Sequence, residues 1–333
     1  MESKKCSHKF FWSFIIFLII VLLGSMLVNF GLIFSSVLGK SDSLSEKAID
    51  EFPKLKEIWS YGKGTSKAVR IEIKGTIFRS REKGLFTPKK DKIENIISQI
   101  NAAKNDSFVK AIILEVESPG GAITPSDEIY HALMNFKKSD SNRKVIVFMK
   151  SIAASGGYYI SMAGDHIIAE PTSIIGSIGV IIQTLNWKSL SEKIGITDTT
   201  IASGKNKDML NPFKDVSDEQ IELLENMVKT LHERFITIVK ESRNIELSKL
   251  DFLADGRIFS SKEAIENNLI DEIGYWQDVV KKTSSLCNEK ELKIIRYEHM
   301  TTFMDLFTEA RRPIDVNITL DTQVPELMYL WKP

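Results

Sequence analysis

The chain has 333 residues, of which 43% are hydrophobic and 26% are charged, so it can bury a sizeable core in one or two domains. Lysine and arginine total 44, as do aspartate and glutamate, so there is no global positive charge to attract nucleic acid or an anionic membrane. Cys6 and Cys287 stand at opposite ends of the chain, and no cysteine–histidine cluster has the spacing of a structural zinc site. These observations argue against a nucleic-acid partner, a disulfide framework and a zinc module.

The chain opens with a long run that lacks charged side chains, from Phe10 to Gly39. The hydrocarbon core of a bilayer is ~30 Å thick and needs about 20 apolar helical residues, whereas the apolar part of a cleaved signal peptide usually spans only ~7–15. The run therefore predicts an uncleaved transmembrane anchor at residues 10–38. The alternative is a long signal peptide that is cleaved near the small residues at 35–39.

Three lysines among the first nine residues precede this run. By the positive-inside rule they place residues 1–9 in the cytoplasm and the chain from Lys40 onward on the other side of the membrane. Residues 40–66 mix serine, lysine and acidic residues with few apolar positions, and we expect a partly helical stalk there. We expect the globular domain at residues 67–292 and a C-terminal extension without a readable motif at 293–333.

Strand and helix patterns alternate along the globular domain. Apolar and polar residues alternate after Lys67, as in a half-buried strand, and residues 109–116 form a nearly continuous aliphatic run, as in a strand covered on both faces. Further strands are predicted at 144–149 and 166–169 with an apolar stretch at 174–182, and helices at about 91–104, 125–136, 217–243 and 261–268. The alternation predicts an α/β fold with a largely parallel sheet, whose function gathers at the turns from strand to helix.

One of these turns places a serine before two glycines. A strand runs into Ser155, Gly156 and Gly157, which puts Ser155 at or near the N-terminus of a helix with its hydroxyl facing outward. The N–H of Gly156 can then point at an incoming carbonyl oxygen, and the missing side chains let a substrate backbone approach closely. The alternative is that Ser155 only caps the helix, as serine often does.

A second turn, Ser118-Pro119-Gly120-Gly121, also follows a buried strand. Its backbone N–H groups can form a concave arrangement that accepts an anion. Taken alone, the segment is equally consistent with an ordinary loop.

A serine nucleophile needs a base. The chain has five histidines in no recognisable triad pattern: His8, His131, His166, His232 and His299. A neutral lysine can replace histidine, because desolvation away from carboxylates lowers a lysine pKa from about 10.4 towards 7. The candidate lysines are Lys150, Lys205, Lys207 and Lys214, and composition does not choose among them.

Several segments, in their order along the chain, resemble the signature set of the signal peptide peptidase A (protease IV) family. They are Ser118-Pro-Gly-Gly, Ala154-Ser-Gly-Gly-Tyr-Tyr, Gly176-Ser-Ile-Gly-Val, Ser203-Gly-Lys-Asn-Lys-Asp, and the later segments 256–264 and 269–274. The resemblance covers roughly residues 67–280. It implies a ClpP/crotonase-like fold with repeated ββα units, a Ser–Lys dyad and oligomeric assembly.

The resemblance also implies roles for single residues. Ser155 matches the nucleophile and Lys207 the general base. Ser177 matches the hydroxyl that hydrogen-bonds the lysine amine, and Gly121 and Gly156 match the backbone donors of the oxyanion hole. The chain is too short for the duplicated form of the family, so it resembles the short form, in which neighbouring protomers of a homo-oligomeric ring complete each active site.

With these roles, neutral Lys207 takes the proton of Ser155, the serine attacks a peptide carbonyl, and water hydrolyses the acyl-enzyme without a metal or other cofactor. Asp208 adjoins the lysine and would keep it charged if its carboxylate turned towards the amine. The expected enzyme is a serine endopeptidase that degrades remnant signal peptides and other hydrophobic or unfolded peptides. A single-pass helix would hold it in the lipid bilayer of a bacterial cytoplasmic membrane, with the peptidase domain on the periplasmic or extracytoplasmic side.

Two other functional classes share part of this pattern. A crotonase-fold acyl-CoA enzyme also uses two backbone donors, but the predicted anchor places this chain outside the cytoplasm. A catalytically silent scaffold that binds membrane proteins would keep the fold and lose the dyad, whereas both dyad positions are filled here. Covalent labelling of Ser155 by a fluorophosphonate distinguishes an enzyme from such a scaffold.

Overall fold

The computed structural model describes residues 3–38, 55–79, 91–299 and 328–330, and the chain divides into two compact units between Glu51 and Phe52. The first unit holds α1 (Ser3–Leu38). Within this helix, Trp12–Phe30 is long and apolar enough to cross a membrane, and its side chains are largely exposed. At 1.5 Å per residue, a helix of this length spans about 28 Å, close to the ~30 Å of a hydrocarbon core.

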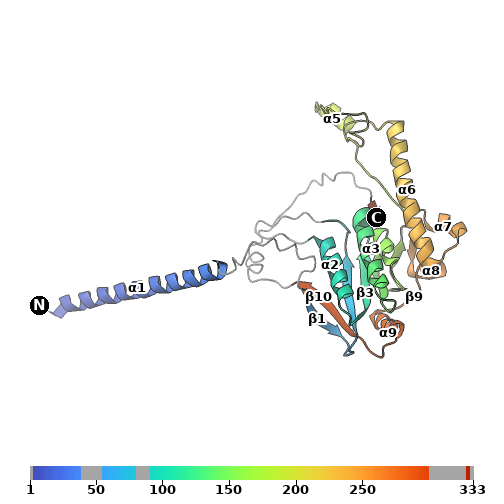
Figure 1. Cartoon of the computed structure of the whole chain (residues 1–333). Coiled ribbons are helices and arrows are strands. Elements are labelled where there is room, and N and C mark those ends of the chain that lie inside the picture. Colours follow the sequence, from blue (N-terminus) through green and yellow to red (C-terminus); the bar gives the residue numbers. More distant parts are fainter. Residues whose placement is uncertain (1–2, 39–54, 80–90, 300–327, 331–333) are drawn as a thin grey trace. The chain divides into compact units, whose positions relative to one another are not determined.

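The second unit is built on a nine-stranded mixed sheet (Figure 1). The strand order is β1-β10-β2-β3-β5-β6-β9, with β7 beside β5 and β8 beside β7, and β4 pairs separately with β11. The bounds are β1 (Leu55–Tyr61), β2 (Lys67–Lys74), β3 (Val109–Ser118), β4 (Gly120–Ala122), β5 (Lys144–Ala154), β6 (His166–Ala169), β7 (Ile174–Gly176), β8 (Ile258–Ser260), β9 (Glu272–Ile273), β10 (Lys293–His299) and β11 (Met328–Leu330). Strands β2, β3, β5 and β6 run parallel to one another, as the sequence predicted.

Helices cover both faces of this sheet. One hydrophobic cluster joins one face to α2, α3, α4 and α6, and a second cluster joins the other face to α9 (Figure 1). The bounds are α2 (Lys92–Asn105), α3 (Ile123–Lys138), α4 (Gly156–Ser161), α5 (Lys188–Ile194), α6 (Asp218–Arg243), α7 (Leu247–Leu253), α8 (Ser261–Glu266) and α9 (Trp276–Leu286).

The aliphatic run of β3 owes its composition to burial on both faces. Ile112 and Leu114 belong to the cluster under α2 and α3, while Ala111 and Ile113 belong to the cluster under α9. Because successive side chains of a strand point to opposite faces, a strand between two helical layers needs apolar residues at every position. The continuous run therefore predicted the layered architecture correctly.

The sheet extends beyond the interval 67–292 at both ends. Residues 55–61, where we expected a stalk, form the edge strand β1, and residues 293–299, where we expected an extension, form β10. β10 lies between β1 and β2, antiparallel to the former and parallel to the latter. Its apolar residues are buried near this edge of the sheet. Their burial depends on strand partners more than 200 positions away in the sequence. The rest of the predicted extension lies outside the described residues, apart from β11.

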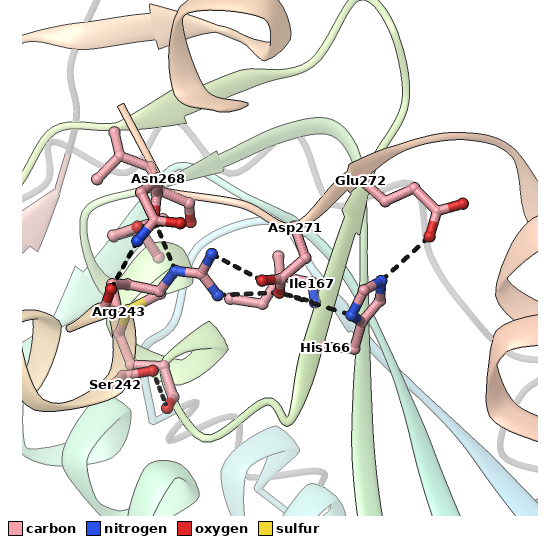
Figure 2. Close-up of polar contacts among 10 residues, drawn as sticks. His166, Ile167, Ser242, Arg243, Asn268, Asp271 and Glu272 are labelled. Atoms are coloured by element: carbon pink, nitrogen blue, oxygen red, sulfur yellow. Dashed lines mark hydrogen bonds and ion pairs between the residues drawn. The ribbon is translucent and has the colours of Figure 1, made fainter. Parts of the chain in front are cut away.

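The long helix α6 is fastened to the sheet at its C-terminal end (Figure 2). Arg243, its last residue, is 7% exposed and donates two hydrogen bonds of 2.9 Å to the carboxylate of Asp271. Asp271 also accepts the backbone N–H of Ile167 in β6 at 2.7 Å, and beside it His166 and Glu272 lie 3.1 Å apart. Burial alone would raise the pKa of Asp271, but the hydrogen bonds and charge of Arg243 outweigh it and hold this pKa below its usual value.

Arg243→Ala should lower the free energy of unfolding by about 3 kcal/mol, because it leaves a partly buried carboxylate without its cation. The loss should shrink as the pH falls below about 4, since the pKa of Asp271 is depressed in the folded chain and its stabilising effect disappears on protonation. Chemical denaturation of the full chain at neutral and acid pH measures both effects. Arg257→Ala, which breaks an exposed pair with Asp255, is the matched control and should leave the midpoint nearly unchanged. Equal losses in the two variants would contradict this role of Arg243.

Candidate active site

Ser155 sits in a strained turn between β5 and α4. Its φ of 54° and ψ of −115° lie in a region that residues with side chains rarely adopt. The side chain makes no capping hydrogen bond to α4, although Ser155 occupies the N-cap position. The reading in which Ser155 only caps the helix is therefore not supported, and its hydroxyl is left for the cavity that it lines.

Ser177 reaches the same place from the neighbouring strand. The parallel register of β5 and β7 pairs Ala154 with Gly176, and the N–H of Ser155 donates to the carbonyl of Gly176 at 2.7 Å. Ser177, which follows directly, also has a positive φ of 51°, and its own N–H donates to the carbonyl of Arg257 at 2.7 Å. Two serines from adjacent strand ends thus line one cavity.

The two glycines predicted as oxyanion-hole donors also lie together. A Cβ atom on Gly156 would stand 3.2 Å from the backbone nitrogen of Gly121 and 2.7 Å from Oγ of Ser126. A Cβ atom on Gly121 would stand 2.3 Å from the carbonyl oxygen of Ile77. Only glycine fits either turn without a shift of its neighbours. The turn that holds Gly121 and the turn that follows Ser155 therefore lie in contact with each other.

The cavity has a volume of about 460 Å³, and its lining mixes small, apolar and polar side chains. Its members are Ser155, Ser177, Gly179, Val180, Ile181, Gln183, His232, Ala254, Asp255, Gly256 and Leu330. Hydrogen bonds from Arg257 hold the pKa of Asp255 below its usual value, so the cavity carries an anion at its edge. No lysine lines the cavity within the described part of a single chain. Across all the residues that the structure describes, no three or more histidine, cysteine, aspartate or glutamate side chains form a cluster that could hold a metal ion.

The C-terminal strand β11 lies against this cavity, a feature that the sequence did not indicate. Tyr329 is paired antiparallel with Gly121, and Met328 exchanges two backbone hydrogen bonds of 3.0 and 3.1 Å with Ile181. Leu330 lines the cavity itself. A segment of the chain thus occupies a groove between β4 and Ile181 as an extended strand. Three residues carry too little local pattern to predict this pairing.

Lys207 is exposed and does not line the cavity of its own chain. It lies in the segment between α5 and α6, and Figure 1 shows α5 beside the end of α6 that points away from the sheet. Its ammonium group has no ion-pair or hydrogen-bond partner within the described ranges. Asp208 instead binds Lys214 at 2.6 Å, a hydrogen bond that lowers the pKa of Asp208, and Lys205 binds Glu219 at 2.7 Å.

Sequence profiles of two families match the part of the chain that holds this site. The profile of peptidase family S49 matches residues 137–290, and that of Clp protease matches residues 65–183. A candidate signal peptide peptidase, SppA, of Enterococcus faecium is 37% identical over 265 residues, which are 79% of this chain and 73% of that protein. The chain belongs to peptidase family S49.

Two further relatives agree with this assignment. A candidate protease of Methanocaldococcus jannaschii is 33% identical over 64% of this chain and 68% of that protein. Protease 4 of Haemophilus influenzae is 33% identical over 60% of this chain, a match that spans 32% of that protein. The chain is therefore a serine peptidase, and the predicted resemblance to the signal peptide peptidase A family and the ClpP-like α/β fold are both confirmed.

Gly156→Ala should reduce the rate at which a fluorophosphonate labels the full chain by about 10²-fold. The added methyl group would meet Ser126 Oγ at 2.7 Å and press on the turn at Gly121, and a displacement of ~1 Å at reacting groups has an effect of that order. Ser126→Ala alone should label nearly as fast as wild type. Added to Gly156→Ala, it should restore part of the rate, since it removes the nearest clashing atom. Wild-type labelling by Gly156→Ala would show that the close approach of the two turns is not required.

Proposed function

We propose that this serine peptidase is a membrane-anchored endopeptidase that uses a Ser155–Lys207 dyad to degrade remnant signal peptides and other hydrophobic or unfolded peptides. The observation that carries the proposal is the geometry of Ser155. In this strained turn the side chain of Ser155 makes no capping hydrogen bond to α4 and lines a cavity. Ser177 lines the same cavity, and the two glycine turns lie beside it. Besides a base, acyl transfer needs a nucleophile and donors for the oxyanion, and the second hydroxyl is placed to orient that base.

The base comes from a neighbouring protomer in this proposal. Lys207 is exposed in its own chain and stands apart from any carboxylate partner in the described residues, so it needs burial by another surface to become neutral. A second copy of the chain, packed against the segment between α5 and α6, would supply that surface and bring the amine to its own Ser155. A closed ring satisfies this condition for every protomer at once.

The reaction then follows from these positions. Neutral Lys207 accepts the proton of Ser155 as the serine Oγ attacks the peptide carbonyl, and the oxyanion is bound by the N–H groups of Gly121 and Gly156. The lysine returns the proton to the leaving amine, and it activates the water that hydrolyses the acyl-enzyme. The hydroxyl of Ser177 forms a hydrogen bond with the lysine amine and so orients it. No metal or other cofactor enters these steps.

Two features support peptide substrates that are met at a membrane. β11 lies beside the cavity as an extended strand between β4 and Ile181, a position that the backbone of a peptide substrate would take in its place. The apolar helix at Trp12–Phe30 would keep the enzyme at the bilayer, where hydrophobic segments remain after secretion. The lysines before this helix favour a peptidase unit on the periplasmic or extracytoplasmic side of a bacterial cytoplasmic membrane.

Mixing inactive protomers tests the shared dyad. Ser155→Ala and Lys207→Ala should each remove nearly all turnover of a short hydrophobic peptide, since loss of general-base assistance alone costs about 10²–10⁴-fold. When the two variants are mixed and allowed to exchange subunits, activity should return, because some sites pair an intact Ser155 with an intact Lys207 from the neighbour. Turnover is measured at several mixing ratios.

Lys205→Ala is the matched control, because this lysine lies two positions away and is already paired with Glu219. It should keep most of the wild-type turnover. Near-normal turnover by Lys207→Ala would contradict the assignment of the base. Inactive single variants that never complement would contradict the sharing of the dyad between protomers.

A further inference from the structure

His232 interrupts the apolar stripe of α6. The stripe runs through Val228, His232, Phe235 and Val239, at the three- and four-residue spacing of one helical face. Phe235 and Val239 are fully buried in the main core, and Val228 lines an apolar groove. A histidine at such a position is most simply a core residue whose ring nitrogens are both satisfied.

The imidazole of His232 is not satisfied in that way. Its Nε2 is buried and has no hydrogen-bond partner among the residues that the structure describes. Buried polar atoms in folded proteins nearly always have a partner, and an apolar side chain of similar size would fill this position without the loss of hydration. The ring also lines the Ser155 cavity, so a molecule bound there could supply the missing partner once Nε2 is uncovered.

His232 also stands at the boundary between two cavities. It lines the Ser155 cavity together with Val180 and Ile181, and the same three residues line a second groove of about 670 Å³. That groove is mostly aliphatic, and its remaining walls come from residues 182, 210 and 216 and from the first half of α6. These three residues therefore form the wall that the two cavities share.

We propose that His232 is a substrate-binding residue, whose Nε2 hydrogen-bonds a main-chain amide or carbonyl of a peptide that runs from the Ser155 cavity into the apolar groove. This rests on the proposed function and names the side chain that holds the substrate there. A substrate strand that took the place of β11 would pair its main chain with β4 on one side and with Ile181 on the other. Where a peptide continues beyond β4 and Ile181 towards the apolar groove, its main-chain groups need another hydrogen-bond partner. The imidazole of His232 lies between the Ser155 cavity and that groove, and the groove receives the apolar side chains of the peptide.

Three full-length variants test this proposal. His232→Leu removes the hydrogen bond and keeps a similar volume, His232→Gln keeps a side-chain donor and acceptor, and His131→Leu removes an exposed histidine of α3 as a control. Each is made alone and in a Ser155→Ala background. The measurements are kcat/KM and KM for a hydrophobic peptide, the rate of fluorophosphonate labelling, the Kd of a fluorescent form of the same peptide in the Ser155→Ala background, and the oligomer size.

His232→Leu should raise both KM and the peptide Kd by about fivefold to tenfold, the effect of one lost neutral hydrogen bond. Its labelling rate, melting temperature and oligomer size should stay at the wild-type values, because the small probe does not need the peptide contact. His232→Gln should recover part of the affinity, and His131→Leu should change nothing.

Unchanged peptide affinity in His232→Leu would overturn the proposal. A parallel fall in labelling would instead place His232 in the activation of Ser155, and a change in oligomer size would assign the groove to a second copy of the chain; either result would also overturn it. If wild-type protein is not labelled at all, the proposed function fails, while the binding measurement in the Ser155→Ala background still decides the role of His232.

Discussion

Two backbone hydrogen bonds hold the reactive end of the sheet, from the N–H of Ser155 to Gly176 and from the N–H of Ser177 to Arg257, each 2.7 Å long. They hold the ends of β5 and β7 in register where the backbone leaves each strand, at Ser155 and Ser177, which both have a positive φ. A serine alone at such a φ is costly, and it persists only because the pairing of β5 with β7 and of β7 with β8 fixes the backbone on both sides. The cavity, the two glycine turns and the position of β11 are all arranged around these two residues.

The helix α6 connects this rigid centre to the part of the chain that carries Lys207. Its second half carries the buried residues of the helix, Phe235, Ile238 and Val239, and ends in the Arg243–Asp271 pair, so it is fixed relative to the sheet. Arg234 and Tyr159 both donate to the carboxylate of Asp127 at 2.5 Å, which ties the middle of α6 to α3 and α4, the helix that follows Ser155. The first half of α6 is more exposed and carries apolar side chains that a neighbouring protomer would cover. In the proposed ring, the same helix would support its own active site and lead to the segment that presents Lys207 to a neighbour.

The sequence predicted most of the elements because their signals are local. The aliphatic run of β3, the strand at 166–169 and the long amphipathic helix all appear where expected. Burial of a strand on both faces leaves a continuous apolar run, and burial of one helical stripe leaves a helical period. β1 and β10 did not reveal their pairing, because two short strands at opposite ends of the domain find each other only through tertiary packing. The same limit applies to β11, whose three residues matter only through their position beside Gly121 and Ile181.

The candidate site was predictable in part for a similar reason. Ser155, Ser177, Gly121 and Gly156 stand in small-residue turns at strand ends, a pattern that sequence displays, and the fold brings all four together. His232 was visible only as one of five histidines, because a stripe position does not reveal whether its ring finds a partner. The environment proposed for Lys207 is the surface of another protomer, and the pattern of a single chain does not contain that surface.

The most direct test of this account is to locate the covalent adduct that a fluorophosphonate forms on the full-length protein. Proteolytic digestion and tandem mass spectrometry assign the modified residue without reference to any substrate. The strained, uncapped geometry of Ser155 predicts a single adduct on that serine, absent after prior denaturation of the protein. An adduct on another serine, or none on the folded wild-type chain, would contradict the central claim that this turn carries the nucleophile.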